Sequence, residues 1–166
     1  MGPVIVCHAT HAETFILEIS RSLIPGGTIG ITTWESISWP TLVQKGLEFA
    51  GSPLVIGDFL GYGNRRSGYD WASRDAIQKL LTDRGYTDIK ITPSSVITHH
   101  PKERFLQALT TTMLPLVMAR FTAEEREKWE SKVVPALGEH WAELFGEDGQ
   151  YEMQMDALVT TATKSA

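Results

Sequence analysis

His8 and His11 are the residues of this sequence best suited to proton transfer near neutral pH. An imidazole ionises in that range, so either side chain can take a proton from a phenol or an acid as a general base. Both follow a short apolar run, Pro3–Cys7, which has the pattern of a parallel strand buried on both faces. His11 is the stronger candidate, because it stands where the next helix begins and can face a pocket. The plainer interpretation is that both are solvent-facing loop residues.

The same histidines are poor candidates for a metal site. Cys7, His8 and His11 lie within one short loop, and no fourth ligand accompanies them. His99 and His100 are distant in sequence and precede a proline, so we predict a loop there. We therefore expect no metal.

The glycine-rich segment 61–68 (Gly-Tyr-Gly-Asn-Arg-Arg-Ser-Gly) suggests phosphate binding at first sight. However, it neither follows a clear strand nor opens a helix, and it lacks the Lys-Ser/Thr pair of a P-loop. Turn formation explains its glycines better, within an ordered loop over residues 52–68. Arg65 or Arg66 can clamp an acidic ligand, or can simply be solvated at the surface.

Aromatic residues gather on both sides of this segment. They are Trp34, Trp39, Tyr69 and Trp71. We weigh two roles for them: the wall of a pocket for an aromatic small molecule, or ordinary packing in the core.

The elements that must position these residues follow from apolar periodicity and from helix-ending residues. A helix over residues 12–24 with Phe15, Ile16, Ile19 and Leu23 on one stripe leads to a strand over 28–33, so the strands before and after it should be parallel. Further along, the sequence predicts helices over 40–50, 73–84, 102–121 with a kink at Pro115, and 122–146 interrupted at Pro135, and strands over 86–98 and 151–163.

The turn before the second strand carries a recognisable motif. Leu23-Ile24-Pro25-Gly26-Gly27, followed by Thr32-Thr33-Trp34, resembles the Leu-Lys-Pro-Gly-Gly signature of class I S-adenosylmethionine-dependent methyltransferases. The closest similarity is to the small-molecule, UbiE-like (type 11) enzymes. Arg84-Gly85-Tyr86 resembles the end of the helix before the sixth strand of that family.

The resemblance implies a partial doubly wound, Rossmann-like α/β sheet. It would comprise the fourth to seventh strands of the class I fold, with a helical insertion and lid helices. The last strand would lie antiparallel between the fifth and sixth. We expect one methyltransferase-like domain over residues 1–166, without the family's glycine-rich cofactor loop or the acidic residue that binds the ribose. The Pro3–Cys7 strand would then be an edge that pairs with another chain, in a homo- or hetero-oligomer.

The resemblance also assigns roles to individual residues. Cys7, His8 and Ala9 would border S-adenosylmethionine, and His11 or His8 would be the general base. Trp34, Arg65, Tyr69 and Trp71 would contact the acceptor.

Composition sets the broad class. The 166 residues are 42% hydrophobic and 21% charged, with a formal net charge of −5 and one cysteine. Such a chain has the profile of a soluble globular protein of one domain. Charges of both signs are interspersed, so we expect no nucleic-acid partner. The absence of an apolar run of about 20 residues predicts no membrane span, and we expect a cytoplasmic protein.

Three functions remain open. The first is a methyltransferase that acts on a small molecule of secondary metabolism and is incomplete without a cofactor half. The second is a non-catalytic partner subunit that modulates another chain. The third is a cofactor-free rearrangement or cyclisation in the retained pocket.

Overall fold

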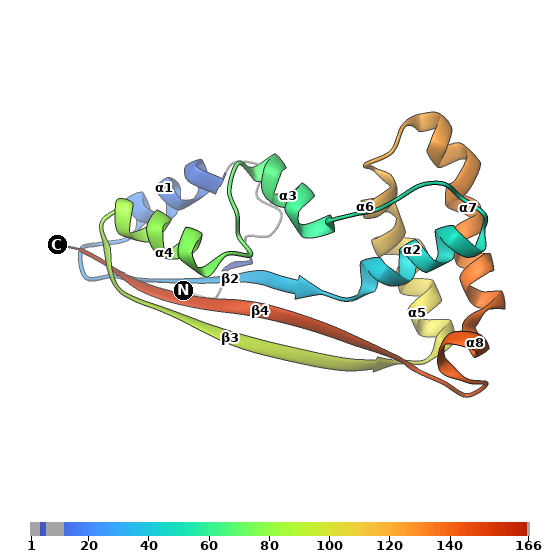
Figure 1. Cartoon of the computed structure of the whole chain (residues 1–166). Coiled ribbons are helices and arrows are strands. Elements are labelled where there is room, and N and C mark those ends of the chain that lie inside the picture. Colours follow the sequence, from blue (N-terminus) through green and yellow to red (C-terminus); the bar gives the residue numbers. More distant parts are fainter. Residues whose placement is uncertain (1–3, 6–11, 166) are drawn as a thin grey trace. The chain divides into compact units, whose positions relative to one another are not determined.

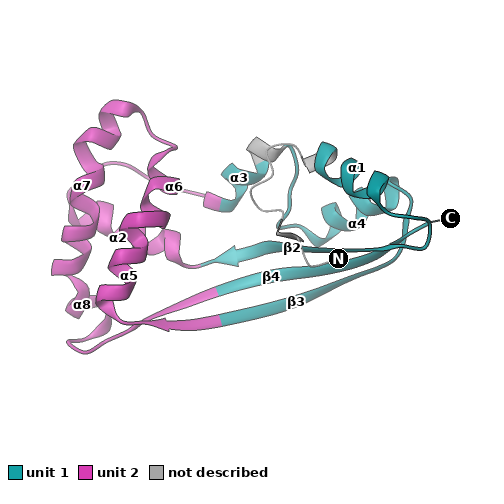
Figure 2. Ribbon diagram, turned by 180° about the vertical axis from the view of Figure 1, so that it is seen from behind, with its two compact units in different colours: residues 1–37, 60–96, 155–166 teal, residues 38–59, 97–154 magenta. Residues whose placement is uncertain are grey.

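The computed structural model describes residues 4–5 and 12–165, and it describes the side chains of these residues except at 4–5, 12–13 and 65–67. The chain divides into two compact units (Figure 2). Unit 1 comprises residues 1–37, 60–96 and 155–166, and unit 2 comprises residues 38–59 and 97–154. Over the described part of the chain, no helix has the length and apolar character needed to cross a membrane.

The sheet has the strand order β1-β2-β4-β3 (Figure 1). Its strands are β1 (Val4–Ile5), β2 (Thr28–Ile37), β4 (Tyr151–Lys164) and β3 (Tyr86–His100). β1 is parallel to β2, as the crossover through the first helix predicts, and β4 is antiparallel to β2. The last strand therefore lies between β2 and β3, which confirms the predicted position.

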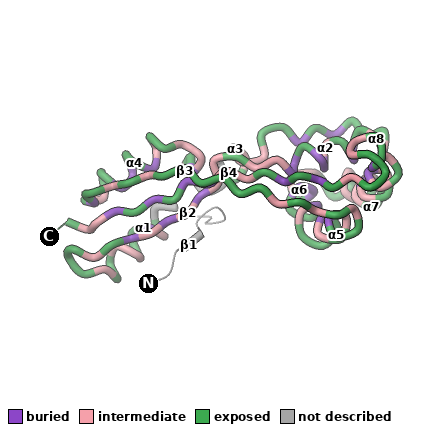
Figure 3. Tube along the Cα trace, turned by 90° about the horizontal axis from the view of Figure 1, so that it is seen from below, coloured by how far each residue is buried: buried purple, intermediate pink, exposed green. Residues whose placement is uncertain are grey.

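Alternation along β2 shows which face of the sheet is packed. Ile29, Ile31 and Thr33 are buried, while the residues between them are half-buried (Figure 3). Two helices, α1 (Ala12–Ser22) and α4 (Arg74–Asp83), pack on the buried face. The core of unit 1 consists of Ile16, Ile29, Ile31, Trp71, Ile77, Leu80, Leu81, Tyr86, Leu158 and Ala162. The predicted apolar stripe of the first helix is confirmed, because Phe15, Ile19 and Leu23 pack against this cluster around Ile16.

The Pro-Gly-Gly turn joins α1 to β2 and is fixed by the last strand. Gly26 has a φ of +76°, which a side chain would strain, and a Cβ at Gly27 would lie 2.8 Å from the carbonyl oxygen of Ile24. The Gly26 N–H donates to the carbonyl of Lys164, and the Lys164 N–H donates to that of Gly27. The motif therefore has a structural role in this chain.

The Lys164 side chain completes this junction. Its Nζ donates to the carbonyl oxygens of Ser20 at 2.7 Å and Leu23 at 2.8 Å. These carbonyls belong to the last turn of α1 and the residue after it, where the helix leaves acceptors unsatisfied and where a positive charge is favourable. The end of the first helix is thus capped by the end of the last strand.

Replacing Lys164 with methionine should lower the unfolding free energy by about 2 kcal/mol, because two bonds from a charged donor are lost. Urea unfolding followed by tryptophan fluorescence measures the change. Lys90→Met, at an exposed position of β3, is the matched control and should change little. Equal effects of both substitutions would contradict this role for Lys164.

Unit 2 is built mainly of helices. Its elements are α2 (Trp39–Phe49), α5 (Lys102–Ala108), the π-helix η1 (Leu109–Met113), α6 (Leu114–Met118), α7 (Ala123–Glu139) and α8 (Trp141–Phe145). The predicted capping box of α7 is confirmed, since the Thr122 side chain and the Glu125 carboxylate bond to each other's backbone N–H. The predicted disturbance at Pro115 takes the form of the π-helix just before it, because proline cannot donate to the preceding turn.

Several predicted boundaries were wrong. The loop expected over 52–68 contains a helix, α3 (Phe59–Ser67), despite its glycines. The first residue of this helix is Phe59. Its ring packs edge-on against that of Trp39, with the ring centroids 5.0 Å apart. The helix expected over 122–146 is divided at His140, whereas Pro135 lies inside α7 without ending it.

Tyr151, the first residue of β4, bonds to Ser38, the residue before α2. Its hydroxyl lies 2.7 Å from Ser38 Oγ, and burial raises the pKa of Tyr151, although the bond to Ser38 acts in the opposite direction. An unfolded tyrosine ionises near pH 10, so the unfolded chain loses this proton first. The contribution to stability is therefore complete below about pH 10 and is lost as the pH rises further.

We expect the unfolding free energy of the native protein to fall between pH 9 and pH 11, and Tyr151→Phe to show a shallower fall. Urea unfolding at the two pH values provides the measurement. An unchanged slope in the variant would show that another group controls the alkaline transition.

Candidate functional site

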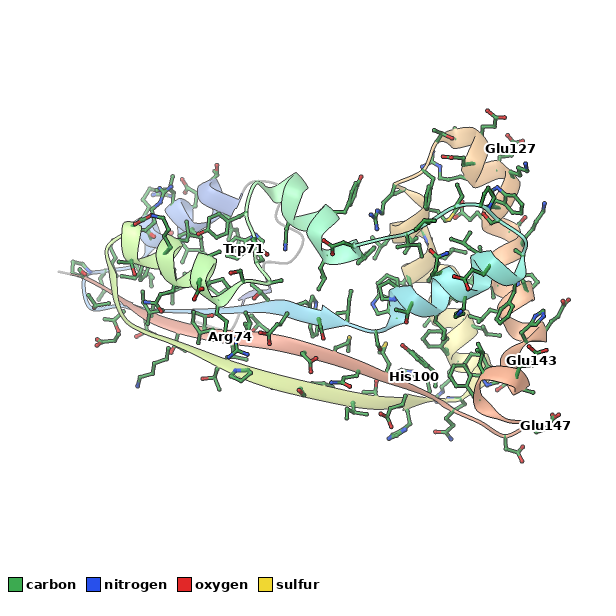
Figure 4. All side chains as sticks on the ribbon, viewed as in Figure 1. Trp71, Arg74, His100, Glu127, Glu143 and Glu147 are labelled. Atoms are coloured by element: carbon green, nitrogen blue, oxygen red, sulfur yellow. The ribbon has the colours of Figure 1, made fainter. Side chains whose placement is uncertain are left out.

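Near the carboxyl end of β2, next to Trp34, lies a glutamate that forms an ion pair with α4. The β2–β4 register shifts between Trp34 and Ser36, so Glu35 is an extra residue in the strand. Both Glu35 oxygens accept from the Arg74 guanidinium, at 3.0–3.1 Å. Arg74 is the first residue of α4, and the capping hydroxyl of Ser73 accepts from Ala76 N–H. The ion pair therefore joins the bulge to the start of this helix; Arg74 is labelled in Figure 4.

A second polar cluster beside this bulge joins side chains of β2, β4 and β3 through hydrogen bonds. Asp156 of β4 accepts from Ser36 Oγ of β2 at 2.5 Å and from Ser95 Oγ of β3 at 2.6 Å. The carboxylate and hydroxyl oxygens can accept hydrogen bonds from a ligand that carries hydroxyl or amine groups. Sequence reasoning missed both groups, because the partners are 39 to 120 residues apart.

Tyr69 and Trp71 are brought together, and both are close to the core. Their rings lie 5.2 Å apart, and the Tyr69 hydroxyl donates to the carbonyl of Ala76. Trp71 is only 2% exposed, on the face of the sheet that α1 and α4 cover (Figure 4). This burial favours the packing alternative for Trp71. Contact with an acceptor remains a prediction for both residues.

Trp34 is half-buried in β2, three residues before the strand ends, so its predicted place at the end of the strand was wrong. The bulge after it explains the error, because the bulge interrupts the alternation from which the strand was recognised. Arg65 lies in α3, but its side chain is outside the described part of the chain. Cys7, His8, Ala9 and His11 are also outside the described residues, so their predicted roles are untested.

The predicted loop at His99 and His100 was also wrong. Both residues belong to β3, and His100 Nε2 lies 2.8 Å from the hydroxyl of Thr98. Among the residues that the structure describes, no group of three or more His, Cys, Asp or Glu could hold a metal ion.

A shallow hollow of about 400 Å³ lies against α4. Both signs of charge line it, from Asp70, Lys79, Asp83 and Arg84. Of the predicted acceptor residues, only Tyr69 is among the residues that line the hollow. The predicted acceptor residues therefore do not gather around it.

The described residues fit only part of an S-adenosylmethionine site. β1 is the edge strand of the described sheet, and residues 7–9, which the resemblance placed beside the cofactor, are not described. The glycine-rich loop and the acidic ribose ligand of the resembled family do not occur in this sequence. The described residues therefore account for only part of such a site.

Comparison with known proteins shows which proteins this chain is related to. No family model matches the chain. The chain is 26% identical over 161 residues to the acetylaranotin bis-thiomethyltransferase of Aspergillus terreus, covering 95% of this chain and 57% of that protein. It is 26% identical over 150 residues to the methyltransferase ktnA of Aspergillus niger, covering 89% of this chain and 48% of that protein.

A third relative is the methyltransferase tpcH of Aspergillus fumigatus, 24% identical over 148 residues, with 89% of this chain and 52% of that protein covered. The chain is a distant homologue of fungal secondary-metabolism methyltransferases. It spans about half the length of these curated relatives.

Among solved structures, a phosphoethanolamine N-methyltransferase of Haemonchus contortus matches with 16% identity and a TM-score of 0.41. The match covers 99% of this chain and 33% of that one.

Proposed function

We propose that this chain is part of an S-adenosylmethionine-dependent methyltransferase that acts on a small molecule of secondary metabolism. The observation that carries the proposal is the sequence relationship to the Aspergillus terreus methyltransferase over 95% of the chain. The position of β4 between β2 and β3 supports it, because the resemblance to class I enzymes implies this order.

The described residues suit the acceptor side of such a site. Ligands of open α/β sheets bind outside the carboxyl ends of the strands, where β2 presents Trp34, Glu35 and Ser36. Trp34, Arg65, Tyr69 and Trp71 are the proposed acceptor-binding residues. His11, or His8, would accept the proton that the acceptor loses.

The cofactor side is proposed to be completed by a polypeptide segment outside residues 1–166. Bound S-adenosylmethionine supplies an activated methyl group for an oxygen, nitrogen or carbon atom of the acceptor. Cys7, His8 and Ala9 would border it from this chain. The Pro3–Cys7 strand is the proposed contact with the completing segment, because β1 lies at the edge of the described sheet.

A second candidate function is a non-catalytic subunit that pairs with another chain. The observation that favours it is the lack of the glycine-rich cofactor loop in this sequence. The two functions differ in whether S-adenosylmethionine binds once the missing segment is supplied.

Calorimetric titration with S-adenosylmethionine tests the proposal, with the mass of the protein in solution measured alongside. The chain is titrated alone and after co-expression with the part of the Aspergillus terreus relative that precedes the matched region. We expect saturable binding in the second case, and His11→Ala should keep this binding but lower methyl transfer. A folded complex that binds no S-adenosylmethionine would favour the non-catalytic subunit.

A further inference from the structure

Three buried polar atoms of unit 1 lack a hydrogen-bond partner within the described structure. They are Thr33 Oγ1, Thr160 Oγ1 and Trp71 Nε1. Their residues are 1%, 0% and 2% exposed. A buried polar group without a partner costs about 1–3 kcal/mol, so three of them in one core need an explanation.

The strand register places the two threonines close together on one face of the sheet. Thr33 lies opposite Leu158, and Thr160 lies opposite Ile31. The threonines are therefore diagonal neighbours on β2 and β4; such pairs are typically about 7–8 Å apart, and their Cβ atoms are somewhat closer together. Both point to the packed face, because Ile31 and Leu158 belong to the core beneath α1 and α4.

Trp71 belongs to the same core cluster as Ile31 and Leu158, the cross-strand partners of Thr160 and Thr33. Its indole N–H can only donate, whereas each threonine hydroxyl can donate or accept. A single oxygen atom that accepts from Trp71 and bonds to both hydroxyls would give all three atoms a partner.

We infer that Thr33, Thr160 and Trp71 form a binding site for one buried water molecule. Buried waters in proteins typically make about three hydrogen bonds to otherwise unpaired polar groups. This water accepts from Trp71 Nε1 and donates its two hydrogens to the threonine oxygens. It connects the segment before α4 to the centre of the sheet. It thereby positions Trp71, which the sequence analysis assigned to the acceptor site.

Nuclear magnetic resonance of the native chain tests the site without any substitution. We expect a cross-peak between the Trp71 indole proton and a long-lived water, which slow exchange with solvent distinguishes from surface hydration. The other indole N–H groups provide internal references, including that of Trp141, which donates to the carbonyl of Gly149. A Trp71 indole proton with no contact to water would overturn the inference.

Isosteric substitutions give an independent measurement. Thr33→Val and Thr160→Val should each lower the thermal midpoint by roughly 2–4 °C, since a bridging water loses a partner. The double variant should lose less than the sum, because both threonines bind the same molecule. Thr161→Val, at an exposed position of β4, is the matched control. Higher midpoints for the single variants, with additive effects, would show that the core is dry.

Discussion

Phe105→Ala is expected to lower the unfolding free energy of unit 2 by about 3–5 kcal/mol, a large share of what holds a small domain together. Phe105 is fully buried in α5. Its ring lies 4.6 Å from that of Tyr151 in a T-shaped arrangement, and 6.0 Å from the rings of Trp141 and His100. Alanine would remove the centre of this aromatic group and leave a cavity.

Thermal and urea unfolding of the variant measure this loss. Leu116→Ala is the control, because Leu116 is 44% exposed on a neighbouring helix and its truncation should cost little. Phe105→Leu should be intermediate, since it retains most of the apolar volume. If Phe105→Ala were no less stable than the Leu116 variant, the aromatic group would not be the core of unit 2.

Gly149→Ala is the second substitution with a large expected effect. A Cβ at this position would overlap with the backbone carbonyl group of Phe145. Backbone atoms cannot move aside as a flexible side chain can, so the turn between α8 and β4 must change shape. The shift would also disturb the bond from Trp141 Nε1 to the Gly149 carbonyl. We expect a loss of about 2–4 kcal/mol.

Gly138→Ala is the matched control in the same unit. Its added methyl would meet only the end of the Leu106 side chain, at 3.3 Å, and this side chain can give way. Tryptophan fluorescence and thermal unfolding compare the two variants. Equal midpoints would mean that the turn at Gly149 adapts without cost.

The sequence predicted the core of unit 1 well because the periodicity there is regular. The stripe around Ile16, the cap at Ser73 and the parallel pairing of β1 with β2 follow from local patterns and short connections. The place of β4 between β2 and β3 came from the resemblance to a family, since periodicity alone does not give strand order.

Interactions between distant residues were beyond prediction from one sequence. Nothing local indicates that Glu35 pairs with Arg74, or that Asp156 receives hydroxyls from two strands. The helix α3 was missed because Gly61 and Gly63 disfavour a helix, while packing of Phe59 against Trp39 was not visible from spacing. Trp71 shows a further limit, because an aromatic residue suited to a ligand pocket is equally suited to a core.

The position of β4 has a consequence for how the protein is made. Residues 151–164 are synthesised after β2 and β3, yet this strand lies between them in the sheet. β2 and β3 therefore each have an edge that stays unpaired until β4 has been synthesised. During this interval only α1 and α4 are in place to cover the apolar face of β2, and exposed apolar surface and unpaired strand edges favour aggregation. A pause in translation shortly before residue 151 would be the moment of greatest risk of aggregation.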